Sequence, residues 1–130
     1  MQELEQIQLF LEEQLTDDPY MVEQRGASLS VYLARTGKIY ADAKADYQRA
    51  LKSEIIDKIL PEMAKAAGAS FTVQNLLAKS ACYELEHVVN LAERSHKTCV
   101  RQLDWCRSVL SKHKEELRQS QHTNVHITNQ

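Results

Sequence analysis

Turn-forming residues are scarce in this chain. Its 130 residues include 3 glycines and 2 prolines, whereas β-sandwiches, β-barrels and repeated βαβ units need many turns rich in these residues. The scarcity excludes most β architectures and favours long helices. The length fits one domain, and 43% hydrophobic with 26% charged residues is typical of a folded chain rather than a disordered one.

Long apolar runs are also missing. No segment approaches the roughly 18–20 consecutive apolar residues of a membrane span, and the apolar patch at residues 9–11 is flanked by Gln and Glu, unlike a secretory signal. The 3 cysteines, Cys82, Cys99 and Cys106, are an odd number, which predicts reduced thiols. We therefore expect a cytoplasmic protein without a disulfide framework and without membrane contact.

Basic residues are absent from the start of the chain. Residues 1–18 contain six acidic side chains and no lysine or arginine, although the whole chain has a net charge of only −2. The remaining residues therefore carry 16 basic and 12 acidic side chains. So small a net charge predicts no polyanion binding from the whole-protein field. The uneven distribution allows the acidic segment to dock against a basic surface or to contact a partner protein.

Apolar residues follow helical spacing from the start. In residues 1–17 they predict a short acidic amphipathic helix over about residues 2–15, with an apolar face of Leu4, Ile7, Leu11 and Leu15. The dipeptide Asp18-Pro19 then predicts the start of the next helix. An aspartate accepts hydrogen bonds from the first backbone N–H groups of a helix, and proline suits the first helical position.

Residues 18–118 are predicted to form a long two-helix hairpin. Gly26 and Gly37 lie inside its first helix and are interpreted as places of close helix–helix approach rather than as breaks. The expected inner face of this helix is Met21, Ala27 or Ser28, Tyr32, Thr36, Ile39, Ala43, Tyr47, Ala50 or Leu51, Ile55 and Ile59.

We place the turn of the hairpin near residues 67–72. Pro61 kinks or ends the regular part of the first helix, Gly68 is its natural stop, and Ser70 or Thr72 caps the second helix.

The second helix carries an apolar seam from Val73 to Leu117. The seam alternates spacings of three and four over about six heptads, as in a coiled coil. After Arg118 the segment 119–130 contains no charged residue and is predicted to be a flexible polar tail.

Two helices packed as a hairpin leave one side of each helix uncovered. We therefore predict an all-α fold: an elongated antiparallel helical hairpin with coiled-coil character and a short N-terminal helix, assembled into a homo-oligomer. The apolar residues that lie off the seams and need further burial are Tyr20, Val22, Leu29, Leu33, Tyr40, Leu60, Leu76, Leu85 and Val100.

Two spacings are compatible with metal binding, but both have simpler interpretations. Cys99, Cys106 and His113 are seven residues apart, about 10 Å along a helix, whereas the ligands of one zinc ion must converge on a point. Glu84-x-x-His87 matches the helical unit of di-iron bundles, which need two such units and further glutamates. No glycine-rich phosphate loop or nucleophile motif is present, so we predict no metal, no cofactor and no enzymatic activity.

Basic side chains form the most informative pattern. Arg94, Lys97 and Arg101 follow i, i+3, i+7 spacing, which places them on one helix face. Basic side chains neutralise phosphates, and aromatic rings stack on unpaired bases. The simpler alternative is a solvated coiled-coil flank with Glu–Lys pairs. The candidate nucleic-acid contacts, which the resemblance described next assigns to single-stranded DNA, are Lys38, Lys44, Tyr47, Arg94, Lys97, Arg101 and Arg107.

Two strings in these helices resemble the UvsY recombination mediators of large tailed phages. They are Lys44-Ala45-Asp46-Tyr47 in the first long helix, and Leu103-Asp104-Trp105-Cys106 with the following residues 107–112 in the second. Lys44 matches the second basic position of the family's DNA-binding element. Asp42 stands at the first basic position, and Lys38 lies one turn earlier.

The resemblance implies an oligomeric ring that binds single-stranded DNA. It also implies that the protein helps to load a recombinase onto strands covered by single-strand-binding protein, so the implied partners are single-stranded DNA and those two proteins. The alternative is a structural or protein-interaction helical bundle of a phage or mobile element without nucleic-acid binding.

Overall fold

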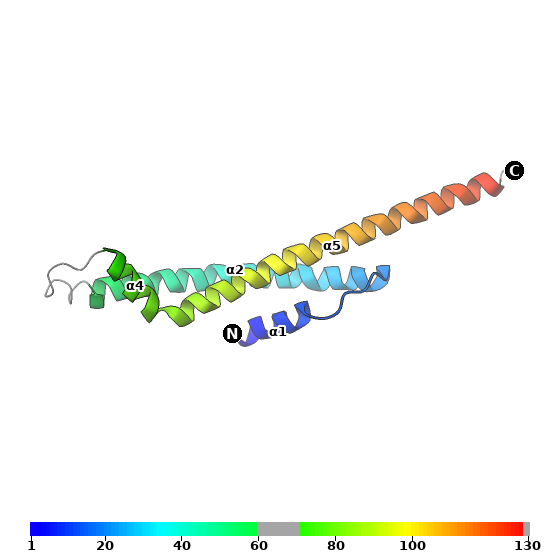
Figure 1. Cartoon of the computed structure of the whole chain (residues 1–130). Coiled ribbons are helices and arrows are strands. Elements are labelled where there is room, and N and C mark those ends of the chain that lie inside the picture. The colour runs from blue at the N-terminus through cyan, green and yellow to red at the C-terminus, as the bar shows by residue number, and fades with distance from the viewer. Residues whose placement is uncertain (60–70, 129–130) are drawn as a thin grey trace.

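The computed structural model describes residues 1–59 and 71–128, and every element in this part of the chain is helical. The elements are α1 (Gln2–Leu11), α2 (Pro19–Ser53), the π-helix η1 (Glu54–Ile59), α4 (Phe71–Ala81) and α5 (Tyr83–Thr128). The long helices α2 and α5 run antiparallel to each other, and α1 lies along this pair (Figure 1). The predicted all-α fold with one long helix pair is confirmed.

The start of α2 follows from its first two residues. Asp18 has an extended backbone, and its carboxylate accepts a hydrogen bond from the Tyr20 backbone N–H at 3.3 Å. Pro19 occupies the first helical position, where its missing N–H is not needed. The predicted helix start is therefore confirmed. By contrast, α1 ends at Leu11 rather than near residue 15, so Leu15 lies in the linker to α2.

α2 continues unbroken through both of its glycines. A Cβ atom added at Gly26 would lie 3.9 Å from the Cβ of Cys106, and one added at Gly37 would lie 3.4 Å from the Cε1 of His96. Both distances are ordinary van der Waals contacts. The continuous helix is confirmed, but the approach of α5 does not require glycine at either position.

Gly37→Ala is therefore expected to raise the free energy of unfolding by about 0.5–1 kcal/mol, because alanine loses less backbone entropy than glycine in a helix interior. Urea unfolding followed by circular dichroism measures the change. Gly26→Ala is the matched companion, since its added Cβ meets Cys106 at the longer distance of 3.9 Å. A loss of stability in Gly37→Ala alone would mean that the His96 ring cannot accommodate the methyl group.

The second long helix is interrupted, unlike the single helix that the seam predicts. Cys82 separates α4 from α5, and its backbone N–H donates to the carbonyl oxygens of both Ala78, at 3.1 Å, and Lys79, at 3.2 Å. This shared hydrogen bond tightens the turn, and α4 leaves the line of α5 at a clear angle (Figure 1). Thr72 lies within α4 instead of capping it. The rest of the expected turn, with Gly68 and Ser70, lies outside the described residues, and so does Pro61, the expected kink or end of the first helix.

The C-terminal segment also differs from its expectation as a flexible tail, because α5 continues to Thr128. Residues 119–128 contain no glycine or proline that would end a helix. Within this segment the Thr123 hydroxyl donates to the Gln119 carbonyl at 2.9 Å, as helical threonines commonly do. The absence of charge thus did not prevent the helix from continuing.

The core lies where α1, α2 and α5 meet. Its buried members are Ile7 and Leu11 from α1, Val22 and Leu29 from α2, and Cys99, Leu103 and Cys106 from α5. Near its start the inner face of α2 differs from the expected one, because Val22 is 1% exposed whereas Met21 is 49% exposed. Farther along, Thr36 is buried as expected, and Tyr32 and Ile39 pack against the core. Helix α1 forms a third wall and buries Val22 and Leu29 within one chain.

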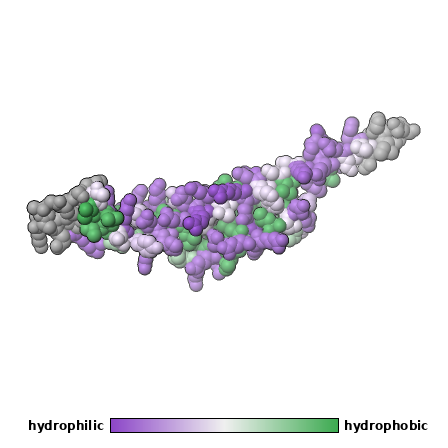
Figure 2. Space-filling view, in the orientation of Figure 1, coloured by the Kyte–Doolittle hydropathy of each residue, from purple (hydrophilic) through white to green (hydrophobic). Residues whose placement is uncertain are grey.

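Large apolar side chains nevertheless remain on the surface. Figure 2 shows apolar surface near the α4 end of the molecule and along its middle. At the α4 end the exposed apolar residues include Ile56, Leu76 and Leu77, and on the outside of α2 Val31 is 62% exposed. Among the described residues, none of the helices combines the length and hydropathy that crossing a membrane requires.

Candidate nucleic-acid interface

The outer face of α5 carries a shallow basic groove of about 360 Å³, lined by Asn90, Glu93, Arg94, Lys97, Thr98 and Arg101. The face opposite this groove holds Ala92, Ser95 and Cys99, all of them buried, so the groove points away from α2. The structure therefore brings three of the predicted contacts, Arg94, Lys97 and Arg101, onto one surface. We call this surface the α5 groove.

The charges in the α5 groove are only partly compensated. The Lys97 ammonium is 2.9 Å from the Glu93 carboxylate, one helical turn away. In the described part of the chain, Arg94 and Arg101 form no ion pair. Exposed pairs of the Glu93–Lys97 kind contribute little to stability. The groove therefore presents two uncompensated guanidinium groups to the solvent.

The predicted contacts on α2 are not part of this groove. Lys38 follows the fully buried Thr36 by two positions, and consecutive helical residues are about 100° apart, so Lys38 lies on the side of α2 that faces away from α5. Its ammonium pairs with Asp42 at 2.6 Å. The ammonium of Lys44 is 5.9 Å from the ring centroid of Tyr40. A single chain therefore does not join these lysines to the α5 groove.

Tyr47 differs most from its expected role. Its ring is half-buried, and burial raises the pKa of its hydroxyl, with smaller contributions from Glu86 and Cys82. Both of those residues lie at the bend between α4 and α5, so Tyr47 is close to that bend. An aromatic ring that stacks on bases needs an open face, which a half-buried ring offers only in part.

Arg107 lies six residues beyond Arg101, the last residue of the α5 groove, which is between one and two helical turns. Its guanidinium is 3.6 Å from the Asp104 carboxylate, and its side chain is 70% exposed. It neighbours the buried Cys106 in sequence, which places it on the flank of α5. Arg107 therefore extends the basic surface of this helix without lining the α5 groove.

A cluster around Arg25, which sequence reasoning missed, fixes the end of α1. One guanidinium nitrogen of Arg25 pairs with the Glu13 carboxylate at 3.2 Å. The other donates to the Phe10 carbonyl at 2.8 Å and to the Gln102 side-chain oxygen at 2.9 Å. The Gln102 amide in turn donates to the Leu11 carbonyl at 2.8 Å. The last carbonyls of α1 are thus bound by α2 and α5 together, and a cation at a helix C-terminus is electrostatically favourable.

The first turn of α1 is held by a second arginine. Arg35 donates two hydrogen bonds to the Glu3 carboxylate, at 2.6 Å and 2.7 Å. These hydrogen bonds hold the pKa of Glu3 below its ordinary value. The acidic segment therefore docks within the chain, but onto Arg25 and Arg35 of α2. Neither arginine belongs to the α5 groove, so that groove remains accessible.

Acid is expected to weaken the first turn of α1. A carboxyl with a lowered folded-state pKa adds stability above its unfolded pKa, and this stability is lost as the pH falls through the folded pKa. Carbon-detected NMR titration of the Glu3 carboxyl measures the effect. Arg35→Gln should raise the pKa of Glu3 toward its ordinary value of 4.5. Lys38→Gln should raise it less, because Lys38 contributes least to the shift; equal responses would contradict a dominant Arg35 hydrogen bond.

Cys99, Cys106 and His96 lie on the seam between α2 and α5. Cys99 and Cys106 are buried in the core, and burial raises the pKa of both thiols. The Thr36 hydroxyl oxygen is 3.1 Å from Nδ1 of His96. Within residues 1–59 and 71–128, no cluster of three or more His, Cys, Asp or Glu side chains has the arrangement of a metal site. These residues act as packing and hydrogen-bonding groups between α2 and α5.

Comparison with known proteins gives no further guidance: no family model, no curated protein and no solved structure matches the chain. The charge, exposure and spacing of the side chains on α5 are therefore the observations that favour a nucleic-acid interface.

Proposed function

We propose that the chain is a helical module that binds single-stranded DNA through the α5 groove. One observation supports the proposal above all others: Arg94, Lys97 and Arg101 line one solvent-facing groove, and neither arginine has a carboxylate partner among the described residues. Guanidinium groups recognise phosphate oxygens through paired hydrogen bonds. Arg94 and Arg101 are two turns apart, about 10 Å along the helix axis, so the groove follows a strand rather than enclosing a single phosphate.

The number of charges in one groove argues for several copies acting together. Three cations contact few phosphates, and the affinity of such binding depends on the number of phosphates neutralised. Association of several copies would repeat the groove along a strand. The exposed apolar side chains available for such association include Leu9, Tyr20, Val31, Leu76 and Tyr83. We therefore propose a homo-oligomer, and light scattering of the purified protein tests it, since a monomeric mass contradicts it.

The resemblance to phage recombination mediators extends the proposal one step further. A protein that binds a single strand along a repeated groove leaves the bases accessible, because the contacts are to phosphates. Loading of a recombinase onto strands covered by single-strand-binding protein is the role proposed on this basis.

Fluorescence anisotropy of labelled oligo-dT, at several salt concentrations, tests DNA binding. The expected result is binding whose affinity falls steeply with salt. The double substitution Arg94→Gln and Arg101→Gln is expected to weaken binding at least tenfold and to lower the salt slope by about 1.4, since each phosphate contact on a single strand contributes about 0.7.

The matched control also removes two positive charges from α5, but beyond the groove: Lys112→Gln with Arg118→Gln. It is expected to retain at least half of the affinity. Equal losses in the two double variants would mean that binding follows net charge and not the α5 groove. No anisotropy change at micromolar protein and about 50 mM salt, where phosphate contacts are strong, would overturn the proposal.

A second candidate function is protein interaction without nucleic acid. The apolar surface at the α4 end favours it, because Ile56, Leu76 and Leu77 are each at least 49% exposed and exposed apolar patches commonly mark interfaces. The ion pairs of Lys38, Lys97 and Arg107 with neighbouring carboxylates also fit a solvated helix surface. An oligomer in light scattering that shows no binding to oligo-dT would support this alternative.

A further inference from the structure

Phosphate contacts in the α5 groove do not by themselves distinguish a single strand from a duplex. Both forms of DNA present phosphates to guanidinium groups, and such contacts fix a position without reading the bases. Aromatic rings supply this distinction, because they stack on bases that are unpaired. The ring expected in this role from the sequence, Tyr47, is half-buried, so the exposed rings of α5 are the relevant ones.

Two exposed aromatic side chains continue the line of the α5 groove toward α4. Tyr83, the first residue of α5, is 69% exposed, and His87, one turn later, is exposed as well. In the part of the chain that the structure describes, neither ring takes part in an aromatic or cation–π contact. Both rings are therefore accessible to a ligand from the solvent.

These rings and the cations of the groove share one face of α5, which we call the α5 stripe. Its members alternate spacings of four and three residues, and all of them are exposed: Tyr83, His87, Asn90, Arg94, Lys97 and Arg101. At about 100° per residue they fall within an arc of roughly 80°. Ala92, Ser95 and Cys99, on the opposite side of the helix, are buried. The stripe is therefore one continuous solvent-facing surface.

We propose that Tyr83 and His87 stack on unpaired bases of the same strand whose phosphates contact Arg94 and Arg101, and that this stacking selects single-stranded over double-stranded DNA. The inference rests on the proposed function, since it concerns the same strand. In a duplex the bases are stacked on one another and paired, and extruding a base costs free energy. A duplex therefore gains the phosphate contacts but not the contacts to the rings.

The charges along the α5 stripe favour this division between bases and phosphates. Between Lys79 and Arg94 the sequence contains no lysine or arginine, and Glu84 and Glu86 lie next to the two rings. Phosphates are therefore attracted to the end of the stripe at Arg94 and Arg101 and repelled from the end that holds the rings. A strand that follows the stripe meets the ring end through its bases.

The dimensions of the stripe fit a short single strand. From Tyr83 to Arg101 it is about 27 Å long. The two rings are attached one turn apart, about 6 Å along the helix axis, which is close to twice the roughly 3.4 Å rise of stacked bases. One base therefore fits between them. The bases beside Arg94 and Arg101 remain free, as loading of a recombinase requires.

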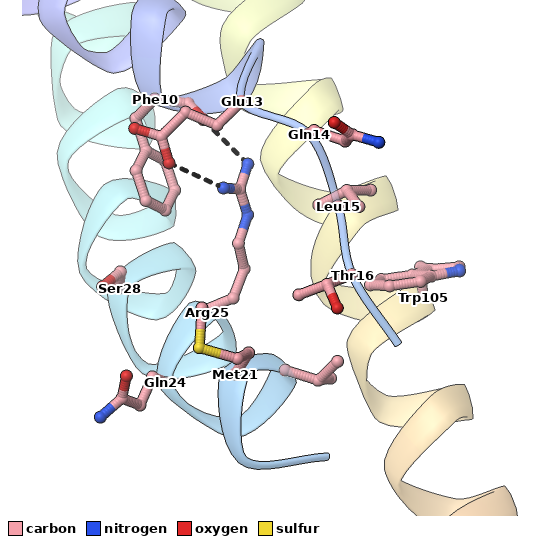
Figure 3. Close-up of a pocket in the computed structure, with 11 residues that line it drawn as sticks. Phe10, Glu13, Gln14, Leu15, Thr16, Met21, Gln24, Arg25, Ser28 and Trp105 are labelled. Carbon is pink, nitrogen blue, oxygen red and sulfur yellow. Dashed lines mark hydrogen bonds and ion pairs between the residues drawn. The ribbon is translucent and has the colours of Figure 1, made fainter. Parts of the chain in front are cut away.

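Other aromatic rings near α5 are not placed for this role. Trp105 packs against the core, and it lines the same pocket as Leu15 and Thr16 of the linker (Figure 3). Tyr20 is 65% exposed but belongs to the start of α2, where it lines a pocket with Leu110 of α5. Since this position is beyond the α5 groove, Tyr20 is the matched control for Tyr83.

The test compares labelled oligo-dT with a labelled abasic oligomer of the same length, which has the phosphates but not the bases. In fluorescence anisotropy the unaltered chain is expected to bind oligo-dT at least tenfold more tightly than the abasic oligomer. Tyr83→Ala should weaken oligo-dT binding about five- to a hundredfold, the contribution of one stacked base. Its salt slope and its affinity for the abasic oligomer and for a duplex should not change, because no phosphate contact is lost.

Further variants separate stacking from other effects. Tyr83→Phe keeps the ring and is expected to bind oligo-dT as the unaltered chain does, whereas His87→Ala should weaken binding in the same direction as Tyr83→Ala. Tyr20→Ala removes a similarly exposed ring outside the stripe and should retain the affinity. Circular dichroism verifies that the variants remain folded, and light scattering should show the mass of the unaltered chain for Tyr83→Ala.

Several outcomes would overturn the inference. Equal affinity of the unaltered chain for oligo-dT and the abasic oligomer would mean that phosphates alone are bound, and the proposed function would then stand without the stacking. An equal loss in Tyr20→Ala and Tyr83→Ala, or a loss in Tyr83→Ala that extends to the abasic oligomer, would exclude base stacking. A lower mass of Tyr83→Ala would assign the ring to association of copies instead. Absence of binding to both oligomers would overturn the proposed function together with this inference.

Discussion

Arg25→Met is expected to lower the free energy of unfolding by about 2–4 kcal/mol, since it deprives two partly buried acceptors of their donor at about 1–3 kcal/mol each. The acceptors are the Phe10 carbonyl and the Gln102 side-chain oxygen. The Arg25 side chain is only 11% exposed, so solvent replaces these bonds poorly. Methionine retains the apolar stem, which separates the loss of hydrogen bonding from the loss of packing. Urea unfolding measures the total change.

The same substitution is expected to release α1 before the rest of the molecule unfolds. Arg25 and Gln102 hold the C-terminal carbonyls of α1, and an isolated helix of 10 residues is marginal in water. Native-state hydrogen exchange of the α1 amides should therefore accelerate more than that of α2 or α5. Arg25→Lys keeps the charge but not the planar fork, so it should lose less stability than Arg25→Met. A change below about 0.5 kcal/mol in Arg25→Met, the range of ordinary surface substitutions, would show that the cluster does not hold α1.

Features of the fold that depend on neighbouring residues were predictable from the sequence. The scarcity of glycine and proline indicated long helices, and the helix start at Asp18 and Pro19 follows from local chemistry within a few residues. The continuity of α2 through its glycines was also predictable, because each glycine costs only about 1 kcal/mol and 35 residues of helix easily offset that cost.

The start of the inner face of α2 was not predictable in the same way. The expected face began at Met21 and continued through Ala27 or Ser28, whereas Val22 and Leu29 are buried there; Thr36, farther along, is buried as expected, and Tyr32 packs against the core. The sequence pattern was interpreted for a hairpin of two helices, in which each helix has one neighbour. The packing of α1 as a third wall shifts the buried face of α2 toward Val22 and Leu29, and this packing depends on contacts between distant segments.

The start and the end of α5 were also not predictable from the sequence. The bend at Cys82 has no glycine or proline to mark it, and its visible local feature is the Cys82 N–H shared between the Ala78 and Lys79 carbonyls. The helix beyond Arg118 was missed for the opposite reason. A segment without charges was interpreted as a tail, although nothing in residues 119–128 prevents the backbone from continuing as a helix.

The residues of the candidate site also divide into those that spacing within one helix predicts and those that depend on packing between helices. Arg94, Lys97 and Arg101 belong to one helix, so their spacing alone places them on one face. Lys38 and Lys44 belong to the other helix, and whether they join that face depends on how the two helices are rotated against each other. The Arg25 cluster joins residues 15 and 77 positions apart in the sequence, and Gln102 reaches Leu11 across 91 positions. No local pattern predicts such contacts. A sign of the cluster in the sequence is that Arg25, a charged residue, stands between the apolar Val22 and Leu29 and would need partners if it were buried with them.

Leu29→Ala tests the three-helix core and is expected to lower the free energy of unfolding by about 3–5 kcal/mol. Leu29 is 0% exposed and packs where α1, α2 and α5 meet. Removing most of its side chain costs the transfer free energy of the lost methyl and methylene groups. It also leaves a cavity that cannot close easily, because side chains from three helices form its walls. Urea unfolding followed by circular dichroism measures the change.

The size of this effect distinguishes the three-helix core from a simple hairpin. In a two-helix hairpin Leu29 would lie at an open flank, and its truncation would cost little more than that of a surface residue. Val31→Ala is the matched control on the same helix: Val31 is 62% exposed, and its change is expected to stay within about 0.5 kcal/mol. Deletion of residues 1–11 supplies the second comparison, because Leu29→Ala should cost much less in a chain that lacks α1. An equal cost in both backgrounds would contradict the packing of α1 against Leu29.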